Sequence, residues 1–369
     1  MPPRRRPLLA TASPRPQRRR TMPAALLTGL RRFEVDDVPL PEPKRGEALV
    51  ELEAVGICGS DLHYWRMGRI GSQAVRFPAV LGHEPAGTVV ALGPGVRRIA
   101  EGQRVAVEPG VTCGRCRECA LGWSNLCSRV RFLGAPGCGG AFQRYLAMPE
   151  TCLEPLPERV DAVLGSAAEP LGVALHALDL VRLRAGERVA VVGGGPVGLC
   201  VVALAQRLGA RVVALCEPRL TRRKVARSLG AERTVEAEAE AFLKAARTGT
   251  RGAGPEVVVE CAGSADGLAV AIAAAARGGR VAVVGIPEVD AQQVDPHLWR
   301  RKELDIVQVR RSNQTLRRIL RLLKGPGLGL QAAGFFSPPV GLDGLQETFE
   351  RLEDAAATEV KVIVDPRRT

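Results

Sequence analysis

A run of glycines constrains the fold of this chain more than any other feature. Gly193-Gly194-Gly195-Pro196-Val197-Gly198 fits the pattern G-x-G-x-x-G and follows the apolar, β-branched stretch 189–192. Residues 196–208 are apolar nearly all round and are predicted to form a buried helix. Glycines between a strand and a helix let the backbone turn tightly and approach a pyrophosphate, which the free N–H groups of the helix N-terminus bind. The motif in this context predicts a dinucleotide site.

The choice between the two nicotinamide cofactors depends on the residue at the end of the next predicted strand, just beyond 212–215. This residue is Glu217, nineteen positions after Gly198. A carboxylate there would accept hydrogen bonds from the adenosine ribose hydroxyls and repel a 2′-phosphate, which favours NAD over NADP. Three nearby arginines argue mildly for NADP: Arg219, Arg222 and Arg223. An alternative is a glycine-rich turn in a doubly wound domain that binds another ligand.

The surrounding sequence predicts an α/β protein with two kinds of domain. Strands and helices alternate over residues 166–300, which is typical of a doubly wound parallel sheet. Residues 22–165 and 301–369 contain short apolar runs between glycines and prolines, which predict a β-rich unit. The nucleotide-binding domain is therefore expected to be inserted into a discontinuous β-rich domain.

The net charge of +13 bears on possible partners. Seven of these charges are arginines in the first twenty residues, which leaves +6 for the rest of the chain. We expect this Pro/Arg-rich segment, 1–21, to be a disordered tail, with a true start at Met22 as an alternative. The longest apolar stretch, 189–205, is short for a membrane span and is broken by glycines. We expect a cytoplasmic protein without a nucleic-acid or membrane partner.

Four cysteines lie close together on one predicted loop: Cys113, Cys116, Cys119 and Cys127. Four thiolates in a tetrahedron satisfy a structural Zn²⁺ and leave no open coordination position. Buried free thiols, an iron–sulfur cluster and a nucleic-acid zinc ribbon are the alternatives. A ribbon usually divides its thiols into two separated pairs, and this cluster does not. We therefore predict a structural zinc site.

A second possible metal site is dispersed along the chain and comprises Cys58, His83, Glu84 and Glu169. A catalytic zinc needs about three protein ligands and one exchangeable position. The spacing of these residues does not establish such a site by itself.

A family resemblance gives these residues a context. The segment 56–64, Gly-Ile-Cys-Gly-Ser-Asp-Leu-His-Tyr, resembles the catalytic-cysteine segment of the zinc-dependent medium-chain dehydrogenases, in particular their sorbitol dehydrogenase branch. Further matching segments follow in the same order: 68–71, 80–84, the cysteine loop, Glu169-Pro170-Leu171, the glycine motif with Glu217, and 309–311. The resemblance covers roughly residues 24–366. It implies a GroES-like β-rich catalytic domain, a Rossmann domain, and assembly as a homodimer or homotetramer.

The resemblance also implies an activity. A polyol dehydrogenase oxidises a secondary alcohol to a ketose and transfers hydride to NAD, with one catalytic and one structural zinc per chain. Cys58, His83 and Glu84 match ligands of the catalytic zinc. Glu169 stands where alcohol dehydrogenases have a second cysteine, and it could bind the zinc directly or hold the water on it. Asp61 matches the carboxylate that orients His83.

The remaining roles are implied by the resemblance in the same way. Ser60 would take the proton of the substrate hydroxyl and pass it through the nicotinamide ribose to His63. Tyr64 and Arg310 match substrate contacts. The implied cofactor-binding residues are Gly193, Gly195, Val197, Gly198, Glu217, Arg222, Val284, Gly285, Ile286, Val309 and Arg310.

Arg311 departs from the family pattern, because the branch often has an aromatic residue there. Two adjacent arginines prompt the hypothesis of a carboxylate or phosphate on the substrate. The simpler interpretation is that one arginine contacts the cofactor and the other forms a salt bridge. Sugar acids, sugar phosphates and threonine are therefore alternative substrates. A zinc-containing nucleic-acid-binding protein is the alternative from another class.

Overall fold

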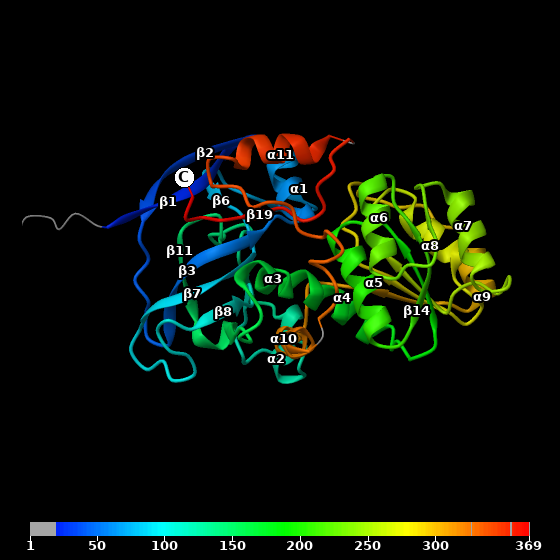
Figure 1. The fold of residues 1–369 in the computed structure, drawn as a ribbon, viewed down its shortest axis with the longest axis horizontal. Helices are drawn as coiled ribbons and strands as arrows, with labels where there is room; N and C mark the ends of the chain where they lie inside the picture. Colours follow the sequence, from blue (N-terminus) through cyan, green and yellow to red (C-terminus); the bar gives the residue numbers. More distant parts are fainter. Residues whose placement is uncertain (1–19, 326, 355, 369) are drawn as a thin grey trace, which may run out of the picture.

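The structure is a computed structural model that describes residues 20–325, 327–354 and 356–368. Figure 1 shows a β-rich half and a half of alternating helices and strands, lying side by side. Most of the predicted tail lies outside the described residues. Its predicted end at residue 21 is wrong, because Thr21 begins β1 (Thr21–Gly29), which pairs with β2 (Arg32–Pro39).

The β-rich half is built around an antiparallel sheet with the order β11-β3-β7-β8-β12. The C-terminal segment returns to this sheet, since β19 pairs with β3. The strands are β3 (Glu47–Gly56), β7 (Glu84–Leu92), β8 (Arg104–Val107), β11 (Tyr145–Pro149), β12 (Leu153–Pro155) and β19 (Ile363–Val364). A second sheet contains β1, β2 and β6 (Ala79–Val80). Figure 1 shows α1 (Gly59–Met67) and α11 (Leu345–Glu353) beside these strands.

Short elements connect these strands and carry several residues of the site. They are β4 (Arg69–Ile70), β5 (Gln73–Ala74), β9 (Gly110–Val111), α2 (Arg117–Ala120), η1 (Ser124–Leu126), β10 (Arg131–Phe132), η2 (Glu150–Cys152) and α3 (Ala162–Ser166). The core of this half buries large side chains completely, among them Trp65, Phe142 and Phe349.

The second half contains the predicted doubly wound sheet. Its strands are parallel throughout and have the order β15-β14-β13-β16-β17-β18, which is the Rossmann order. The strands are β13 (Arg188–Val192), β14 (Arg211–Cys216), β15 (Thr234–Val235), β16 (Val257–Glu260), β17 (Arg280–Val283) and β18 (Asp305–Gln308). The helices are α4 (Ala168–Leu180), α5 (Pro196–Arg207), α6 (Leu220–Ser228), α7 (Ala239–Thr248), α8 (Gly267–Ala274), α9 (Pro296–Lys302) and α10 (Leu316–Lys324).

This sheet confirms the predicted α/β fold class and corrects one boundary. The predicted end of the nucleotide-binding domain at residue 300 is too early, because β18 pairs in parallel with β17. β18 is short and none of its residues is fully buried, so its sequence lacks the long apolar run that marked the other strands of this sheet.

The glycine motif forms the predicted turn between β13 and α5. Gly195 precedes the helix, and Pro196 occupies its first turn. A side chain at Gly198 would place its Cβ 2.0 Å from the carbonyl oxygen of Gly193. The close approach of helix and strand therefore requires glycine at position 198. Among the described residues, no helix combines the length and apolar character that crossing a membrane requires.

Candidate functional site

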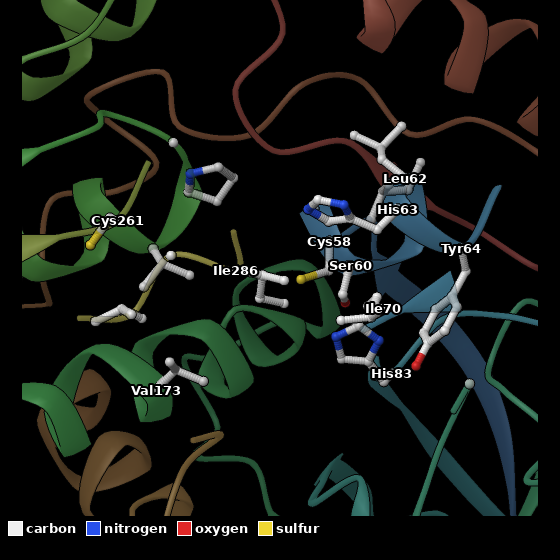
Figure 2. Close-up of a pocket in the computed structure, with 18 of the residues that line it drawn as sticks. Cys58, Ser60, Leu62, His63, Tyr64, Ile70, His83, Val173, Cys261 and Ile286 are labelled. Carbon is white, nitrogen blue, oxygen red and sulfur yellow. The ribbon is translucent and has the colours of Figure 1, made fainter. Parts of the chain in front are cut away.

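The two halves face each other across a cleft of about 550 Å³. Residues of α1 form part of one wall, and the glycine turn and the segments after β17 and β18 form part of the other. Figure 2 shows Cys58, Ser60 and His83 close together, with Cys261 and Ile286 of the nucleotide half across from them. A hollow of this volume accommodates a small substrate beside part of a cofactor.

Three candidate zinc ligands meet in the β-rich half. The ligand atoms of Cys58, His83 and Glu84 all lie within 4.8 Å of one another, and we call these residues the metal triad. Cys58 immediately precedes α1, whereas His83 and Glu84 lie at the start of β7. These distant residues converge because β3, which ends two residues before Cys58, pairs with β7 at Gly56 and Glu84.

Asp61 links the two segments that carry the metal triad. Its Oδ2 accepts a hydrogen bond from the backbone N–H of Cys58 at 3.0 Å, and its Oδ1 accepts one from Gly82 at 3.1 Å. The same Oδ1 lies 3.4 Å from Nδ1 of His83. This contact orients the ring and leaves Nε2 available for a metal, as expected for the carboxylate behind a histidine ligand.

The electrostatics of the metal triad suit a cation. Burial alone would lower the pKa of His83, but Asp61 and Cys58 raise it well above its ordinary value. The surroundings therefore favour positive charge at this imidazole. One thiol, one imidazole and one carboxylate are all donors that zinc accepts, so the residues present fit a zinc ion.

Lys361 is a partner of the metal triad that the sequence analysis missed. Its ammonium forms an ion pair with Glu84 and donates to the carbonyl oxygen of Ile57 at 2.9 Å. Both charged side chains are 1% exposed. The sequence contained one signal of this pair, which is a single lysine in the apolar run 360–364. A lysine that is buried with such a run requires a partner of opposite charge.

Gly56 provides the space for this ion pair. A Cβ at position 56 would lie 2.0 Å from Oε2 of Glu84 and 2.7 Å from Cε of Lys361. Any larger residue would therefore displace the buried pair.

Glu169 lies on α4 and lines the cleft. The described residues whose ligand atoms converge within 4.8 Å do not include it. Burial raises the pKa of its carboxyl group to about 8. Both roles considered for Glu169, direct ligand and holder of a water, stay predictions.

The four clustered cysteines also converge. Their sulfur atoms lie within 4.8 Å of one another, with Sγ–Sγ distances of 3.8 Å between Cys116 and Cys127 and 3.6 Å between Cys127 and Cys113. Zn–S bonds of about 2.3 Å in a tetrahedron require sulfur atoms about 3.8 Å apart. The residues present therefore fit a structural zinc ion.

The cysteine loop holds another part of the cleft in place. We call residues 310–314 the arginine loop. Asn313 accepts a hydrogen bond from Ser124 at 2.8 Å and donates one to Gly122 at 2.9 Å. Asn125 donates to the carbonyl oxygen of Arg310 at 3.0 Å. The cysteine loop thus fixes the backbone of the arginine loop beside the cleft. Its sequence did not indicate this function.

The predicted cofactor-binding residues come together with one exception. The residues that line the cleft are Gly195, Val197, Arg222, Val284, Gly285, Ile286, Val309 and Arg310. Gly193 and Glu217 line an adjoining hollow. Gly198 lines neither, because it packs against Gly193 instead.

Glu217 is buried at the end of β14. Its Oε2 accepts a hydrogen bond from Gly194 at 2.9 Å, and its Oε1 accepts one from Arg219 at 3.0 Å. Arg222 lies 3.9 Å from Oε1. The carboxylate therefore secures the glycine turn in addition to facing the hollow.

Two known families match this sequence. The family described as alcohol dehydrogenase GroES-like domain matches residues 44–158, and the family described as zinc-binding dehydrogenase matches residues 196–325. Sorbitol dehydrogenase of Bacillus subtilis (strain 168) is 35% identical over 347 residues, which cover 94% of this chain and 98% of that protein. Sorbitol dehydrogenase of Gallus gallus is 37% identical over 260 residues, which cover 70% of this chain and 73% of that protein.

A solved structure shares the whole architecture. A zinc-binding dehydrogenase from Sinorhizobium meliloti 1021, bound to NADP, has a TM-score of 0.84 and 34% identity, and the match covers 94% of this chain and 100% of that one. The fold, the metal-ligand sets and these matches place the chain in the zinc-dependent medium-chain dehydrogenases of the alcohol dehydrogenase superfamily. Within that class it is an enzyme of the zinc-binding alcohol and polyol dehydrogenases. The resemblance to the sorbitol dehydrogenase branch is confirmed.

Proposed function

We propose that this enzyme oxidises a secondary alcohol of a polyol to a ketose with NAD as hydride acceptor. The observation that carries the proposal is that two residues of the metal triad, Cys58 and His83, line the same cleft as the glycine turn. Substrate and nicotinamide could therefore meet beside the metal. The sorbitol dehydrogenases at 35–37% identity support a polyol as the substrate class.

Each part of the cleft has a proposed role. A zinc ion held by Cys58, His83 and Glu84 would polarise the substrate hydroxyl and lower its pKa. NAD would supply the hydride acceptor. Asp61 keeps His83 in position, and Tyr64 borders the substrate. Four further thiols would hold the structural zinc, and we expect a homodimer or homotetramer.

Ser60 and His63 would carry the substrate proton away from the cleft. Both line it, and Figure 2 shows both side chains on the segment that follows Cys58. Burial lowers the pKa of His63 below its ordinary value of about 6.5. The imidazole therefore stays neutral, and able to accept a proton, at a lower pH than an exposed histidine.

This pKa shift predicts the pH dependence of oxidation. Protonation of His63 is expected to lower kcat, and this decline should occur below pH ~6.5. His63→Asn is expected to lower kcat about 100-fold at neutral pH, with partial recovery at high pH as hydroxide takes the proton. Steady-state pH profiles of both proteins measure this, and an unchanged kcat in the variant would exclude His63 from the proton path.

Glu217 is expected to determine the cofactor preference. The wild-type enzyme should prefer NAD, because a 2′-phosphate would meet a buried carboxylate. Glu217→Gln should reduce the NAD-to-NADP ratio of kcat/KM about 10-fold or more, since it removes the charge that repels the phosphate. Glu238→Gln is the matched control, because Glu238 is an exposed carboxylate that lines the same hollow. A wild-type preference for NADP would refute the proposed cofactor.

The proposed function is tested by measuring metal content and NAD reduction together. The substrates are neutral polyols, sugar acids, sugar phosphates and threonine. Two zinc ions per chain and NADH formation with a polyol would support the proposal. One zinc ion per chain and no oxidation of any alcohol would refute the catalytic assignment and leave the cysteine site standing.

A further inference from the structure

One residue of the cleft has chemistry that a neutral polyol does not use. Arg311 lines the cleft together with Tyr64 and Glu169. Its guanidinium carbon lies 4.3 Å from the centre of the Phe132 ring. That ring lies 5.4 Å, centre to centre, from the imidazole of His83. The guanidinium is thus separated from a ligand of the metal triad by one aromatic ring.

Arg311 is not directly paired with an anion within the described part of the chain. Its Nη1 is buried and has no hydrogen-bond partner, and no ion pair among the described residues includes Arg310 or Arg311. Two other arginines of the cleft differ, since Arg66 pairs with Glu288 and Arg222 lies near Glu217. Arg219 also has a buried Nη1 without a partner, but its Nη2 donates to the backbone carbonyl oxygens of Leu352 and Asp354. The simpler interpretation of Arg311, a salt bridge, therefore has no support in the structure.

Arg311 is half-buried, and a cation that loses water without gaining an anion is unfavourable. Burial, with a smaller effect from Arg310, lowers the pKa of Arg311 to about 10. The guanidinium still carries its charge at neutral pH. Nearby Tyr64, Glu169 and Glu108 favour this charge, but no ion pair among the described residues joins any of them to Arg311.

The backbone of Arg311 is held in an unusual conformation. Its φ is 58°, in the left-handed region that residues other than glycine rarely adopt. The hydrogen bonds from Ser124 and Asn125 and to Gly122 fix the arginine loop on both sides of it. The backbone that carries the Arg311 side chain is therefore fixed beside the cleft.

We propose that the substrate is an anionic polyol, a polyhydroxy chain that carries a carboxylate or a phosphate, and that Arg311 binds this anion. The inference rests on the proposed function and names the substrate class of the same site. Planar guanidinium groups bind both anions through paired hydrogen bonds. The hydroxyl to be oxidised would lie at the metal triad, and the anion would lie beyond Phe132. A neutral polyol would leave Arg311 without an ion-pair partner.

The test compares three substrates of similar carbon chain on the zinc-loaded, full-length enzyme with NAD. Sorbitol is neutral, gluconate carries a carboxylate and sorbitol 6-phosphate carries a phosphate. We expect kcat/KM for one of the two anions to exceed that for sorbitol about 10-fold or more, and the preferred anion identifies the source of the charge. Arg311→Gln should lower kcat/KM for that anion about 10–100-fold and change it less than about 3-fold for sorbitol. Arg311→Lys should lie between wild type and Arg311→Gln.

Arg66→Gln is the matched control, because Arg66 lines the same cleft but is paired with acids. It should affect charged and neutral substrates equally. Equal or better use of sorbitol by the wild type would overturn the inference and leave the proposed function intact. An anion preference that survives in Arg311→Gln would also overturn it.

Binding measurements separate this inference from the proposed function. If no polyol is oxidised, the proposed function fails. Calorimetric titration of gluconate and sorbitol 6-phosphate into the zinc-loaded protein with NADH then measures the affinity of the anion site directly. Binding that Arg311→Gln weakens about 10-fold or more would support an anion site at Arg311, and equal binding by both proteins would overturn it.

Discussion

Cys58→Ser is expected to lower kcat/KM for alcohol oxidation about 1000-fold or more. The metal triad contributes one thiolate, and zinc binds oxygen of a neutral hydroxyl far less well than a thiolate. Loss of a Lewis acid removes several kcal/mol of transition-state stabilisation, and about 4 kcal/mol corresponds to a factor of 1000. Zinc content should fall from two ions to one per chain.

The variant should remain folded and bind NADH. Cys58 contributes little to the packing around the glycine turn, which lies in the other half of the molecule. Metal analysis, circular dichroism and NADH fluorescence test this alongside activity. Cys138→Ser is the matched control, since Cys138 is another free cysteine of the β-rich half and lies outside both metal-ligand sets. Undiminished turnover by Cys58→Ser would overturn the catalytic assignment.

Lys361→Met is expected to lower the free energy of unfolding of the zinc-free protein by about 3–5 kcal/mol. The substitution keeps most of the side-chain volume but leaves the Glu84 carboxylate buried without its partner, and unpaired buried charges are destabilising by this amount. Urea denaturation measures the loss. Lys361→Met with Glu84→Gln should recover part of it, because the neutral amide carries no charge to bury.

The same variant tests whether Glu84 binds the catalytic zinc. If the zinc accepts the Glu84 carboxylate, the ion replaces the missing ammonium as counter-charge. The loss of stability on Lys361→Met should then be smaller in the zinc-loaded protein than in the zinc-free protein. An equal loss in both states would contradict Glu84 as a ligand and would favour its pairing with Lys361 alone.

Local sequence determined the features that depend on near neighbours. The turn of Gly193 to Gly198, the helix after it and the alternation of strands and helices follow from steric freedom and hydrophobic periodicity over a few residues. The cysteine loop was predictable for the same reason, because its four thiols lie within one short segment. The fold class followed from these patterns and is confirmed.

The tertiary structure decided the features that depend on distant contacts. Sequence spacing did not show that Lys361, near the C-terminus, neutralises Glu84. The two side chains meet only because β19 pairs with β3. Sequence spacing also did not place β18 in the Rossmann sheet or attach the arginine loop to the cysteine loop. Whether a buried charge is neutralised depends on all the segments that pack around it. The order of residues along the chain does not show which segments these are. Arg311 was visible in the sequence as a departure from the family pattern. That no ion pair among the described residues includes it became evident only when the neighbouring segments were in place.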